Sequence, residues 1–520
     1  MRVLACDGIH EDGLALFKQA GWTVEVSDPI KDPKVLAGKL EGFDAVLVRS
    51  ATQVPAEALA KAGKLRVIGR AGAGVDTIDV EAATARGIAV MNAPDGNTLA
   101  AAEHALSLLF ALARHVPRAD AGMKAGEWPK AGLTGFELEG KKLGVIGLGR
   151  IGATVARKAQ GIGMEVAAHD PFLPASAAGK GSVPLVSLDE LLAWADVVTL
   201  HIPRTKDTTN LLNEARLRGM KPGAFLINAA RGGLVDEDAL LRLLEEGHLA
   251  GAALDTFVTE PLPKDSPLRG NPKLILTPHL GASTGEAQQA VSTILARQII
   301  DFVATGAVAG CVNLPPLTPE TAREVGPWMP LMTALGKLAA RLVPAPTRLQ
   351  VTYAGRTEGL DTRPLTRLLV AALLGPASGR VTPVNALHEA AARGLEVAET
   401  LGGDGDGFDR LLRIRVEGGG NVREIEATLH RGPRVVRLDG VELDFDPLAH
   451  ILLMRNEDKP GVIGLVGSHL GAAGVNIVNF SLGATGDGGA VAAITVDREV
   501  PAPQLASLRG IPGILAMEQV

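Results

Sequence analysis

The segment from residue 141 to residue 170 constrains the fold of this chain more than any other. A short apolar run, Leu143 to Ile146, leads into a glycine-rich turn, a helix-forming segment follows, and a second apolar run ends in an aspartate. The turn reads Gly147-Leu148-Gly149-Arg150-Ile151-Gly152. Its three glycines would permit, in order, a tight turn, a close approach of the backbone to a pyrophosphate, and close packing of helix on strand. The new helix would point its unpaired N–H groups at the phosphates. This order of strand, glycines, helix, strand and acid predicts a dinucleotide-binding fold.

The acid that ends the second apolar run, Asp170, indicates which dinucleotide binds. Its carboxylate can accept hydrogen bonds from an adenosine ribose, and it would repel a 2′-phosphate. No Arg or Lys follows it directly. We therefore expect NAD as the cofactor in preference to NADP.

Composition excludes several classes of protein. The chain has 520 residues, 46% of them hydrophobic, and a formal charge of −6 without a basic block, so nucleic acid is not an expected partner. Cys6 and Cys311 are the only cysteines and have no metal-ligand spacing, so we expect no metal site, no disulfide framework and a reducing, cytoplasmic location. The N-terminus reads as a strand and a turn, unlike a signal peptide. No apolar run is long enough to predict a membrane span.

The first part of the chain predicts two Rossmann-like, doubly wound α/β domains. Residues 1–97 alternate short apolar runs with amphipathic segments, which predicts a parallel sheet, and residues 286–315 should return to this discontinuous, substrate-binding domain. Residues 98–285 continue the strand–helix repeats as the NAD-binding domain. That domain starts with a long helix, 99–116, which is apolar nearly all round and is expected to be buried between domains or subunits.

The second part of the chain predicts two smaller units. Residues 316–446 follow a Pro-rich boundary and read as an intervening α+β domain. Residues 449–520 read β-α-β-β-α-β, the pattern of a ferredoxin-like sandwich.

Three strands of the NAD-binding domain each run into one polar residue: Arg231, Glu260 and His279. In a doubly wound sheet the carboxyl ends of the strands open onto one crevice, so these side chains should converge beside the nicotinamide. Hydride transfer between NAD and an alcohol carbon needs a base for the hydroxyl proton, which His279 can supply near neutral pH. Glu260 would stabilise the imidazolium. Arg231 would hold a substrate carboxylate bidentately and polarise the reacting oxygen.

With these residues the chain resembles the D-isomer-specific 2-hydroxyacid dehydrogenases. The matching motifs cover nearly all of residues 1–310 and are GRAGAGVD, GNTLAAAEH, GLGRIG, INAARGGLVDEDAL, ALDTFVTEP and TPHLGAST. The resemblance implies that Arg231, Glu260 and His279 form the catalytic set. Besides the three glycines, it implies NAD contacts at Arg150, Ile151, Asp170, Ala229, Ala230, Asp255, Leu280, Gly281 and Ala282.

The sequence beyond residue 310 is similar to that of the long-form members, which oxidise D-3-phosphoglycerate to 3-phosphohydroxypyruvate, the first step of phosphorylated L-serine biosynthesis. A substrate with both a carboxylate and a phosphate needs several cations. Arg49 and Arg70 lie at or just after strand ends on the same cleft, and the N–H groups of Gly72 and Gly74 could form an anion nest. The family's substrate positions fall on Arg49, Ser50, Arg70 and Asn97.

Two other functions stay open on the sequence. One is a glyoxylate/hydroxypyruvate or D-lactate reductase, against which Arg49, Arg70 and the C-terminal extension argue. The other is a non-catalytic NAD-sensing scaffold, against which the Arg-Glu-His set argues. No role is assigned to His104 or His201, which are expected to be structural.

Residues 449–520 resemble an ACT domain, an amino-acid-binding regulatory module, at NEDKPGVIG (456–464) and GVNI (474–477). The resemblance implies L-serine as a feedback effector, held between paired domains by Asn456, Asp458 and Asn476. A carboxylate can accept from the ammonium of an amino acid, and asparagine can satisfy its carboxylate. Paired ACT domains and the buried helix both imply a homodimer or homotetramer. No site is assigned in the intervening domain.

Overall fold

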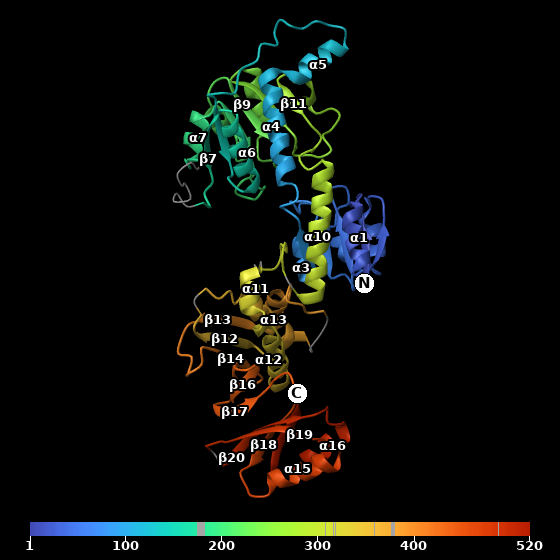
Figure 1. Cartoon of the computed structure of the whole chain (residues 1–520), viewed down its shortest axis with the longest axis vertical. Coiled ribbons are helices and arrows are strands. Elements are labelled where there is room, and N and C mark those ends of the chain that lie inside the picture. The colour runs from blue at the N-terminus through green and yellow to red at the C-terminus, as the bar shows by residue number, and fades with distance from the viewer. Residues whose placement is uncertain are drawn as a thin grey trace.

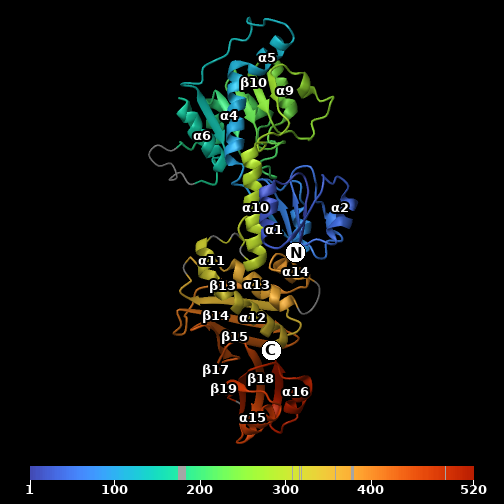
Figure 2. The ribbon, with the colours of Figure 1, turned by 45° about the vertical axis from the view of Figure 1, so that its right-hand side comes forward.

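The computed structural model describes residues 1–520 except 174–182, 307, 316, 318, 358, 376–379 and 487. Four units follow one another along the longest axis of the molecule (Figures 1 and 2). The N-terminal unit, drawn in blue, lies between the cyan-to-green unit and the orange unit, and the red C-terminal unit is at the far end. Chain order and spatial order therefore differ.

The N-terminal unit is a parallel sheet with strand order β2-β1-β3-β4-β5, a doubly wound topology. Its core strands read as unbroken apolar runs because both of their faces are buried, as in AVLV of β3. The strands are β1 (Arg2–Ala5), β2 (Thr23–Val26), β3 (Ala45–Val48), β4 (Val67–Arg70) and β5 (Ala89–Asn92). The helices are α1 (Glu11–Gln19), α2 (Pro33–Leu40), η1 (Ala56–Leu59) and α3 (Val80–Ala85).

The second unit has a parallel sheet with the order β11-β10-β9-β8-β6-β7. A single bridge from Ala168 to Leu185 extends it beyond β7, so with this bridge the order is that of classical dinucleotide-binding sheets, 3-2-1-4-5-6 and one strand more. The strands are β6 (Lys142–Ile146), β7 (Glu165–His169), β8 (Val197–Leu200), β9 (Ala224–Asn228), β10 (Leu249–Leu254) and β11 (Leu274–Leu276). The helices are α4 (Thr98–Arg114), α6 (Arg150–Gly161), α7 (Leu188–Trp194), α8 (Glu214–Arg218), α9 (Glu237–Glu245) and η3 (Pro267–Gly270).

Two hydrophobic clusters sandwich this second sheet. One contains residues of α4 and α6, and the other contains residues of α7, α8 and α9. Successive residues of β9 alternate between them, since Leu226 belongs to one cluster and Ile227 to the other. The sheet is thereby fixed as a rigid platform for the loops at its carboxyl edge.

Helix α10 (Gly285–Thr305) carries the chain from the second unit back to the first. It runs alongside α1, and Figure 1 shows it spanning the length of the N-terminal unit. A Cβ added at Gly13 would lie 2.7 Å from the carbonyl oxygen of Ser292, so only glycine allows the two helices to approach this closely. The His10 backbone N–H also donates to Ser292 Oγ at 3.2 Å.

Helix α4 is buried on one side within the single chain, and its burial between subunits stays a prediction. Leu99 and Phe110 remain about half exposed in the single chain. His115, in the left-handed region, joins α4 to α5 (Val116–Lys124), none of whose nine described residues is buried. Within the described residues no single helix could span a membrane; α4 and α5 together have the length and composition but meet at 66°.

The third unit has the mixed sheet β13-β12-β14-β15-β16-β17, in which only β12 and β13 pair in parallel. The strands are β12 (Arg348–Gly355), β13 (Glu396–Leu401), β14 (Arg410–Gly418), β15 (Asn421–Leu429), β16 (Pro433–Leu438) and β17 (Val441–Phe445). Its helices are α11 (Pro319–Val325), α12 (Trp328–Leu342), α13 (Arg363–Leu374) and α14 (Ala386–Ala392). Helices α12 and α13 pack closely, since a Cβ at Gly336 would lie 2.4 Å from the Leu369 carbonyl oxygen.

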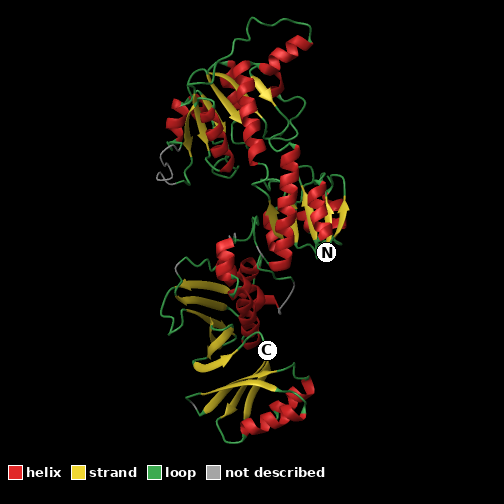
Figure 3. Ribbon diagram, in the orientation of Figure 1, coloured by secondary structure: helices red, strands yellow, loops and turns green. Residues whose placement is uncertain are grey.

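The fourth unit has the antiparallel order β19-β20-β18-β21, with both helices on one face of the sheet (Figure 3). The elements are β18 (His450–Glu457), α15 (Val462–Ala472), β19 (Ile477–Ala484), β20 (Gly489–Val496), α16 (Ala502–Arg509) and β21 (Ile514–Gln519). This is the ferredoxin-like topology that the sequence pattern predicts. Its edge strand β19 abuts β17, where the Asp444 N–H donates to Ser481 Oγ at 2.8 Å.

Candidate active site

The glycine-rich turn lies between β6 and α6, and two of its glycines are sterically required. Gly147 has φ 91°, and a Cβ there would meet the His201 carbonyl oxygen at 2.7 Å. A Cβ at Gly152 would lie 1.9 Å from the Gly147 carbonyl oxygen. At Gly149, the N-cap of α6, nothing lies within 4 Å of the added Cβ, so the backbone is open to a ligand. Space at Gly149 in front of a helix N-terminus fits a pyrophosphate.

Asp170 lies directly after β7 and faces the glycine-rich turn. Its Oδ2 accepts from the Leu148 N–H at 2.9 Å, and its Oδ1 accepts from the Phe172 N–H at 3.0 Å. The acid is therefore held beside the turn, as an adenosine ribose requires. The first helical residue, Arg150, pairs at 2.6 Å with Asp95 of the loop before α4, and Ile151 follows it into α6.

His279 and Glu260 form a hydrogen-bonded pair at the carboxyl edge of the sheet. Nδ1 of His279 lies 2.7 Å from Oε2 of Glu260, whose Oε1 accepts from the Phe257 N–H at 3.0 Å. Burial raises the pKa of Glu260, but the hydrogen bonds from His279 and Phe257 outweigh it and hold that pKa below its usual value. His279 has φ 54°, an uncommon conformation for a residue with a side chain, and such strain is often found at functional sites.

Arg231 follows β9 through Ala229 and Ala230, on the loop that packs against the Glu260 loop. A Cβ at Gly232 would lie 1.8 Å from the Phe257 carbonyl oxygen, so the two loops are in close contact. The Asn228 side chain braces the turn by donating to the Arg231 carbonyl oxygen at 2.8 Å. Sequence reasoning did not find the partner of Arg231: Asp76 of the N-terminal unit accepts from its Nε at 3.0 Å.

Asp255 is fully buried at the end of β10 and holds the loop that bears His279. It accepts from the N–H groups of Leu280 at 2.8 Å and Gly281 at 3.0 Å. His104 Nε2 of α4 lies 3.1 Å from the carboxylate, and Thr277 Oγ1 donates to it. Burial raises the pKa of Asp255, but His104, Thr277 and the N–H groups outweigh it and lower that pKa. His104, to which the sequence assigned no role, is thus a partner of the buried acid.

The predicted substrate residues of the N-terminal unit lie near Arg231, and two of them are cationic. Burial lowers the pKa of Arg70 to about 10, and the positive charges of Arg231 and Arg49 act in the same direction, while the carboxylate of Asp76 offsets part of the shift. Arg70 Nε is buried and has no hydrogen-bond partner among the described residues. A Cβ at Gly72 would lie 1.8 Å from a terminal nitrogen of Arg70, so this glycine makes room for the guanidinium.

Asn97 and Ser50 complete the predicted substrate set. Asn97 is buried before α4, and its Oδ1 is unpaired within the described part of the chain. Ser50 is exposed next to Arg49, whose backbone N–H donates to Asp7 at 2.8 Å. Of the predicted substrate residues, Arg49 and Arg70 are close enough to Arg231 for their charges to interact.

The predicted effector residues do not all come together. Asn456, at the end of β18, is buried, and within the described chain its Oδ1 lacks a partner; Asp458 lies in the exposed turn that follows. Asn456 is opposite Ala490 of β20, whereas Asn476 pairs with Asp497 just beyond the other end of β20. That separation along a strand is roughly 20 Å. A cavity of about 560 Å³ adjoins only the first end, lined by residues of the 457–468 turn and helix together with Pro512 and Gly513.

No group of three or more His, Cys, Asp or Glu side chains in the described residues could hold a metal ion. The other predicted coenzyme residues, Leu280, Gly281 and Ala282, form the turn after His279, and Leu280 is partly exposed. The site consists of a cradle for a dinucleotide, an imidazole–carboxylate pair and a set of guanidinium groups.

This fold and site are those of an NAD-dependent dehydrogenase. The model of the D-isomer specific 2-hydroxyacid dehydrogenase NAD binding domain matches residues 106–281, and that of the D-3-phosphoglycerate dehydrogenase intervening domain matches residues 324–439. Among solved structures, the TT0316 protein from Thermus thermophilus is 38% identical with a TM-score of 0.55, covering 60% of this chain and 100% of that one. A D-2-hydroxyisocaproate dehydrogenase is 30% identical with a TM-score of 0.53, covering 60% and 99%.

Three curated relatives extend the match beyond these domains. D-3-phosphoglycerate dehydrogenase of Bacillus subtilis is 37% identical and covers 100% of this chain and 99% of its own length. The protein of that name from Archaeoglobus fulgidus is 38% identical, with 99% of each chain covered. D-3-phosphoglycerate dehydrogenase 2, chloroplastic, of Arabidopsis thaliana is 38% identical over 100% of this chain and 86% of its own. The chain belongs to the D-3-phosphoglycerate dehydrogenase family, and NAD is its coenzyme.

Proposed function

We propose that the enzyme oxidises D-3-phosphoglycerate to 3-phosphohydroxypyruvate. The observation that carries this proposal is the cluster of guanidinium groups of Arg49, Arg70 and Arg231 beside the His279–Glu260 pair. Asp76 neutralises only one of the three charges in the free chain, so burial and mutual repulsion still favour the binding of an anion. A substrate that bears both a carboxylate and a phosphate supplies more negative charge than lactate or glyoxylate can. The relatives named above carry the same activity in their names.

We assign each group a task from its position. His279 accepts the substrate hydroxyl proton, and Glu260 stabilises the imidazolium across their 2.7 Å contact. Arg231 binds the substrate carboxylate and polarises the reacting oxygen. Bound NAD supplies the acceptor for the hydride. Asp255 positions the His279 loop through its hydrogen bonds to the two N–H groups that follow.

Asp76 adds a step before catalysis. It holds Arg231 in the free chain, and a substrate carboxylate would replace it as the partner of the guanidinium. Both side chains are partly exposed, so the exchange costs little, since pairs of this kind contribute about 1 kcal/mol or less. The pair keeps Arg231 oriented until the substrate arrives.

The direct test is NADH formation from NAD and 3-phosphoglycerate, with glyoxylate reduction measured in parallel. Arg49→Glu should abolish binding of the phosphorylated acid while leaving activity with glyoxylate. Activity with glyoxylate or D-lactate alone would instead assign a reductase. NAD binding that persists in His279→Ala, with no turnover in the unmodified protein, would assign a non-catalytic sensor.

We also propose a division of labour along the chain. Residues 1–97 with 286–315 bind substrate, 98–285 bind NAD, 316–446 form the intervening domain, and 449–520 form an ACT domain. The free thiols of Cys6 and Cys311 support the proposal of a reducing, cytoplasmic location.

For assembly we propose a homodimer or homotetramer. Helix α5 has only nine residues and buries none of them, and a helix of that length does not persist alone in water. Val116 and Met123 on it are about half exposed, and Trp128 after it is 79% exposed, so a second copy would cover them. Light scattering on the purified chain tests this, and a monomer at assay concentration would refute it.

For regulation we propose that L-serine binds the C-terminal unit of paired chains. A cavity next to the turn that holds Asp458 supports this, because Glu457 and Lys459 line it and can pair with the ammonium and the carboxylate of an amino acid. The unpaired amide oxygen of Asn456 precedes this lining by one residue. Asn476 lies too far away in the same chain, so it would have to act from the paired copy. Serine should lower the initial rate, and Asn456→Ala should remove that effect without changing the uninhibited rate.

A further inference from the structure

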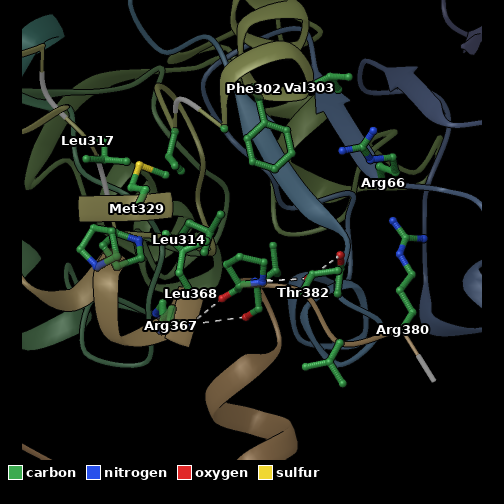
Figure 4. A pocket seen from close by; sticks show the side chains of 18 residues that line it. Arg66, Phe302, Val303, Leu314, Leu317, Met329, Arg367, Leu368, Arg380 and Thr382 are labelled. Carbon is green, nitrogen blue, oxygen red and sulfur yellow. Dashed lines mark hydrogen bonds between the residues drawn. The ribbon is translucent and has the colours of Figure 1, made fainter. Parts of the chain in front are cut away.

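A cavity of about 330 Å³ lies far from the NAD site, between the N-terminal unit and the third unit (Figure 4). Four parts of the chain enclose it: the last turn of α10 with Val308, Leu314, Pro315 and Leu317 after it, Met329 of α12, α13 with the following 380–384 loop, and Arg66 and Gly87 of the N-terminal unit. Its volume lies within the range of about 300–1,000 Å³ that is usual for small-molecule sites. None of its lining residues belongs to the proposed catalytic or effector sites.

One part of the cavity wall is apolar. Figure 4 shows Leu314, Leu317 and Met329 on one side, with the ring of Phe302 above them. Phe302 belongs to α10 and Met329 to α12, and Leu314 and Leu317 lie in the segment between α10 and α11. An occupant would therefore meet hydrocarbon over much of its surface.

The opposite part of the wall is cationic. Arg66 and Arg380 extend from different units and lie near one another in Figure 4. Burial, followed by the charge of Arg66, lowers the pKa of Arg380. Burial also lowers the pKa of Arg367, which makes only long contacts of 3.4 Å to the carbonyl oxygens of Pro383 and Val384. Arg66 is exposed, and in the described chain none of the three arginines forms a salt bridge, although the carboxylate of Asp44 offsets part of the lowering of the Arg380 pKa.

The apolar and the cationic parts of the wall together favour a bound molecule over an empty cavity. Arg367 and Arg380 are partly buried, and Asp44 offsets only part of the repulsion between Arg380 and Arg66, so these guanidinium groups attract an anion. A bare phosphate or acetate would leave the apolar wall uncovered, whereas a neutral apolar molecule would leave the charges unmatched. The occupant must supply both a negative head and a hydrocarbon body.

We propose that the cavity binds a small carboxylate with an apolar body. The carboxylate lies against Arg66 and Arg380, and the body lies on Phe302, Leu314 and Met329. This site is separate from the proposed reaction and does not depend on it.

The ligand would bind two units at once. The 380–385 segment already docks on the N-terminal unit, because Thr382 Oγ1 donates to the Gly87 carbonyl oxygen at 3.1 Å and Asn385 Nδ2 donates to that of Ala85 at 3.3 Å. Arg380 donates to the carbonyl oxygens of Leu65 and Gly63 across the same boundary. An anion held between Arg66 and Arg380 would add a further link, so it should stabilise this boundary against separation.

Octanoate is the probe, titrated into the full chain by calorimetry and by thermal unfolding. We expect a dissociation constant of about 1 mM or tighter. Octanamide, which has the same body without the charge, and acetate, which has the charge without the body, should each bind at least about tenfold more weakly. Octanoate should also raise the midpoint of unfolding with increasing concentration.

Two variants locate the site. Arg380→Gln should weaken octanoate at least about tenfold, but it also removes hydrogen bonds at the boundary. Arg66→Gln avoids that problem, because the Arg66 side chain makes none of those hydrogen bonds, and it should weaken octanoate in the same direction. Arg341→Gln, on the exposed side of α12, is the matched control and should bind octanoate as the unmodified chain does.

Equal binding of octanoate and octanamide would overturn the proposal, as would unchanged octanoate binding in Arg66→Gln. Absence of octanoate binding would overturn it as well. None of these results involves NADH formation, so the proposed dehydrogenase function would stand or fall separately.

Discussion

Replacing Glu260 by Gln tests whether the carboxylate beside His279 acts in catalysis. The substitution keeps the size of the side chain and an oxygen that can accept from His279 Nδ1, but it removes the negative charge. A charge-assisted hydrogen bond contributes about 1.5–3 kcal/mol. The side chains of His279 and Glu260 are 43% and 37% exposed, so water screens the pair, and about 1–2 kcal/mol is the appropriate figure.

This loss should fall on the turnover number. The imidazolium forms as the hydroxyl proton is transferred, so the carboxylate stabilises the transition state more than the bound substrate. A loss of about 1–2 kcal/mol corresponds to a decrease in kcat of about 5- to 30-fold, with little change in KM. The assay is the initial rate of NADH formation, with a single-turnover measurement to separate hydride transfer from product release.

Glu237→Gln is the matched control for this experiment. Glu237 is a neighbouring, half-buried carboxylate that accepts from the Val258 N–H at 2.8 Å and makes no hydrogen bond to His279. Its glutamine variant should keep kcat. A Glu260→Gln enzyme with unchanged single-turnover rate, or one whose defect lies wholly in KM, would refute the reasoning.

Three further outcomes follow from the structure. Gly149→Ala should keep the unfolding temperature, because its Cβ meets no atom of the chain, but it should lose NAD affinity in calorimetry, because that Cβ takes the space left for the pyrophosphate. Gly152→Ala should lower the free energy of unfolding by about 1–3 kcal/mol in denaturant titration, because its Cβ overlaps a carbonyl oxygen. Equal stabilities of the two variants would contradict this. His104→Ala should destabilise the chain by about 1–3 kcal/mol and raise KM for NAD, since it leaves a buried acid with one donor fewer, and wild-type values for both would disprove the positioning role. Burial raises the pKa of Cys6 and of Cys311 to about 11, so both remain neutral thiols at pH 8 and should react with iodoacetamide only on unfolding; mass spectrometry showing rapid native labelling would be the contrary result.

Much of the fold could be predicted from local sequence patterns. The strand runs and the glycine-rich turn depend on neighbouring residues, and the close contacts at Gly147 and Gly152 agree with the tasks assigned to them. The ferredoxin-like unit likewise follows from the order of its elements. The strand at Leu185 could not be predicted, since a single bridge leaves no periodic pattern.

The partners of the site residues were harder to predict. Asp76 and Arg231 are 155 residues apart, and His104 and Thr277 are 173 apart, so nothing local links them. His104 was visible within the GNTLAAAEH motif, but only the packing of α4 against β10 gives it a buried acid as a partner. Asn456 and Asn476 show the reverse case: they are close in sequence but far apart in the structure. A motif fixes a residue in the sequence without saying at which end of a strand it lies.

Helix α10 is long enough that a small rotation would move both of its ends. At about 1.5 Å per residue its 21 residues give a rod about 30 Å long, whose first turn begins shortly after His279. The close contact of Gly13 with Ser292 fixes the helix against α1 at one point along its length. A swing of about 5° about the midpoint would displace either tip by about 1 Å, and a displacement of that size can cost about a hundredfold in rate. The stiffness of a helix that carries no reacting group is thus a condition for the enzyme's speed.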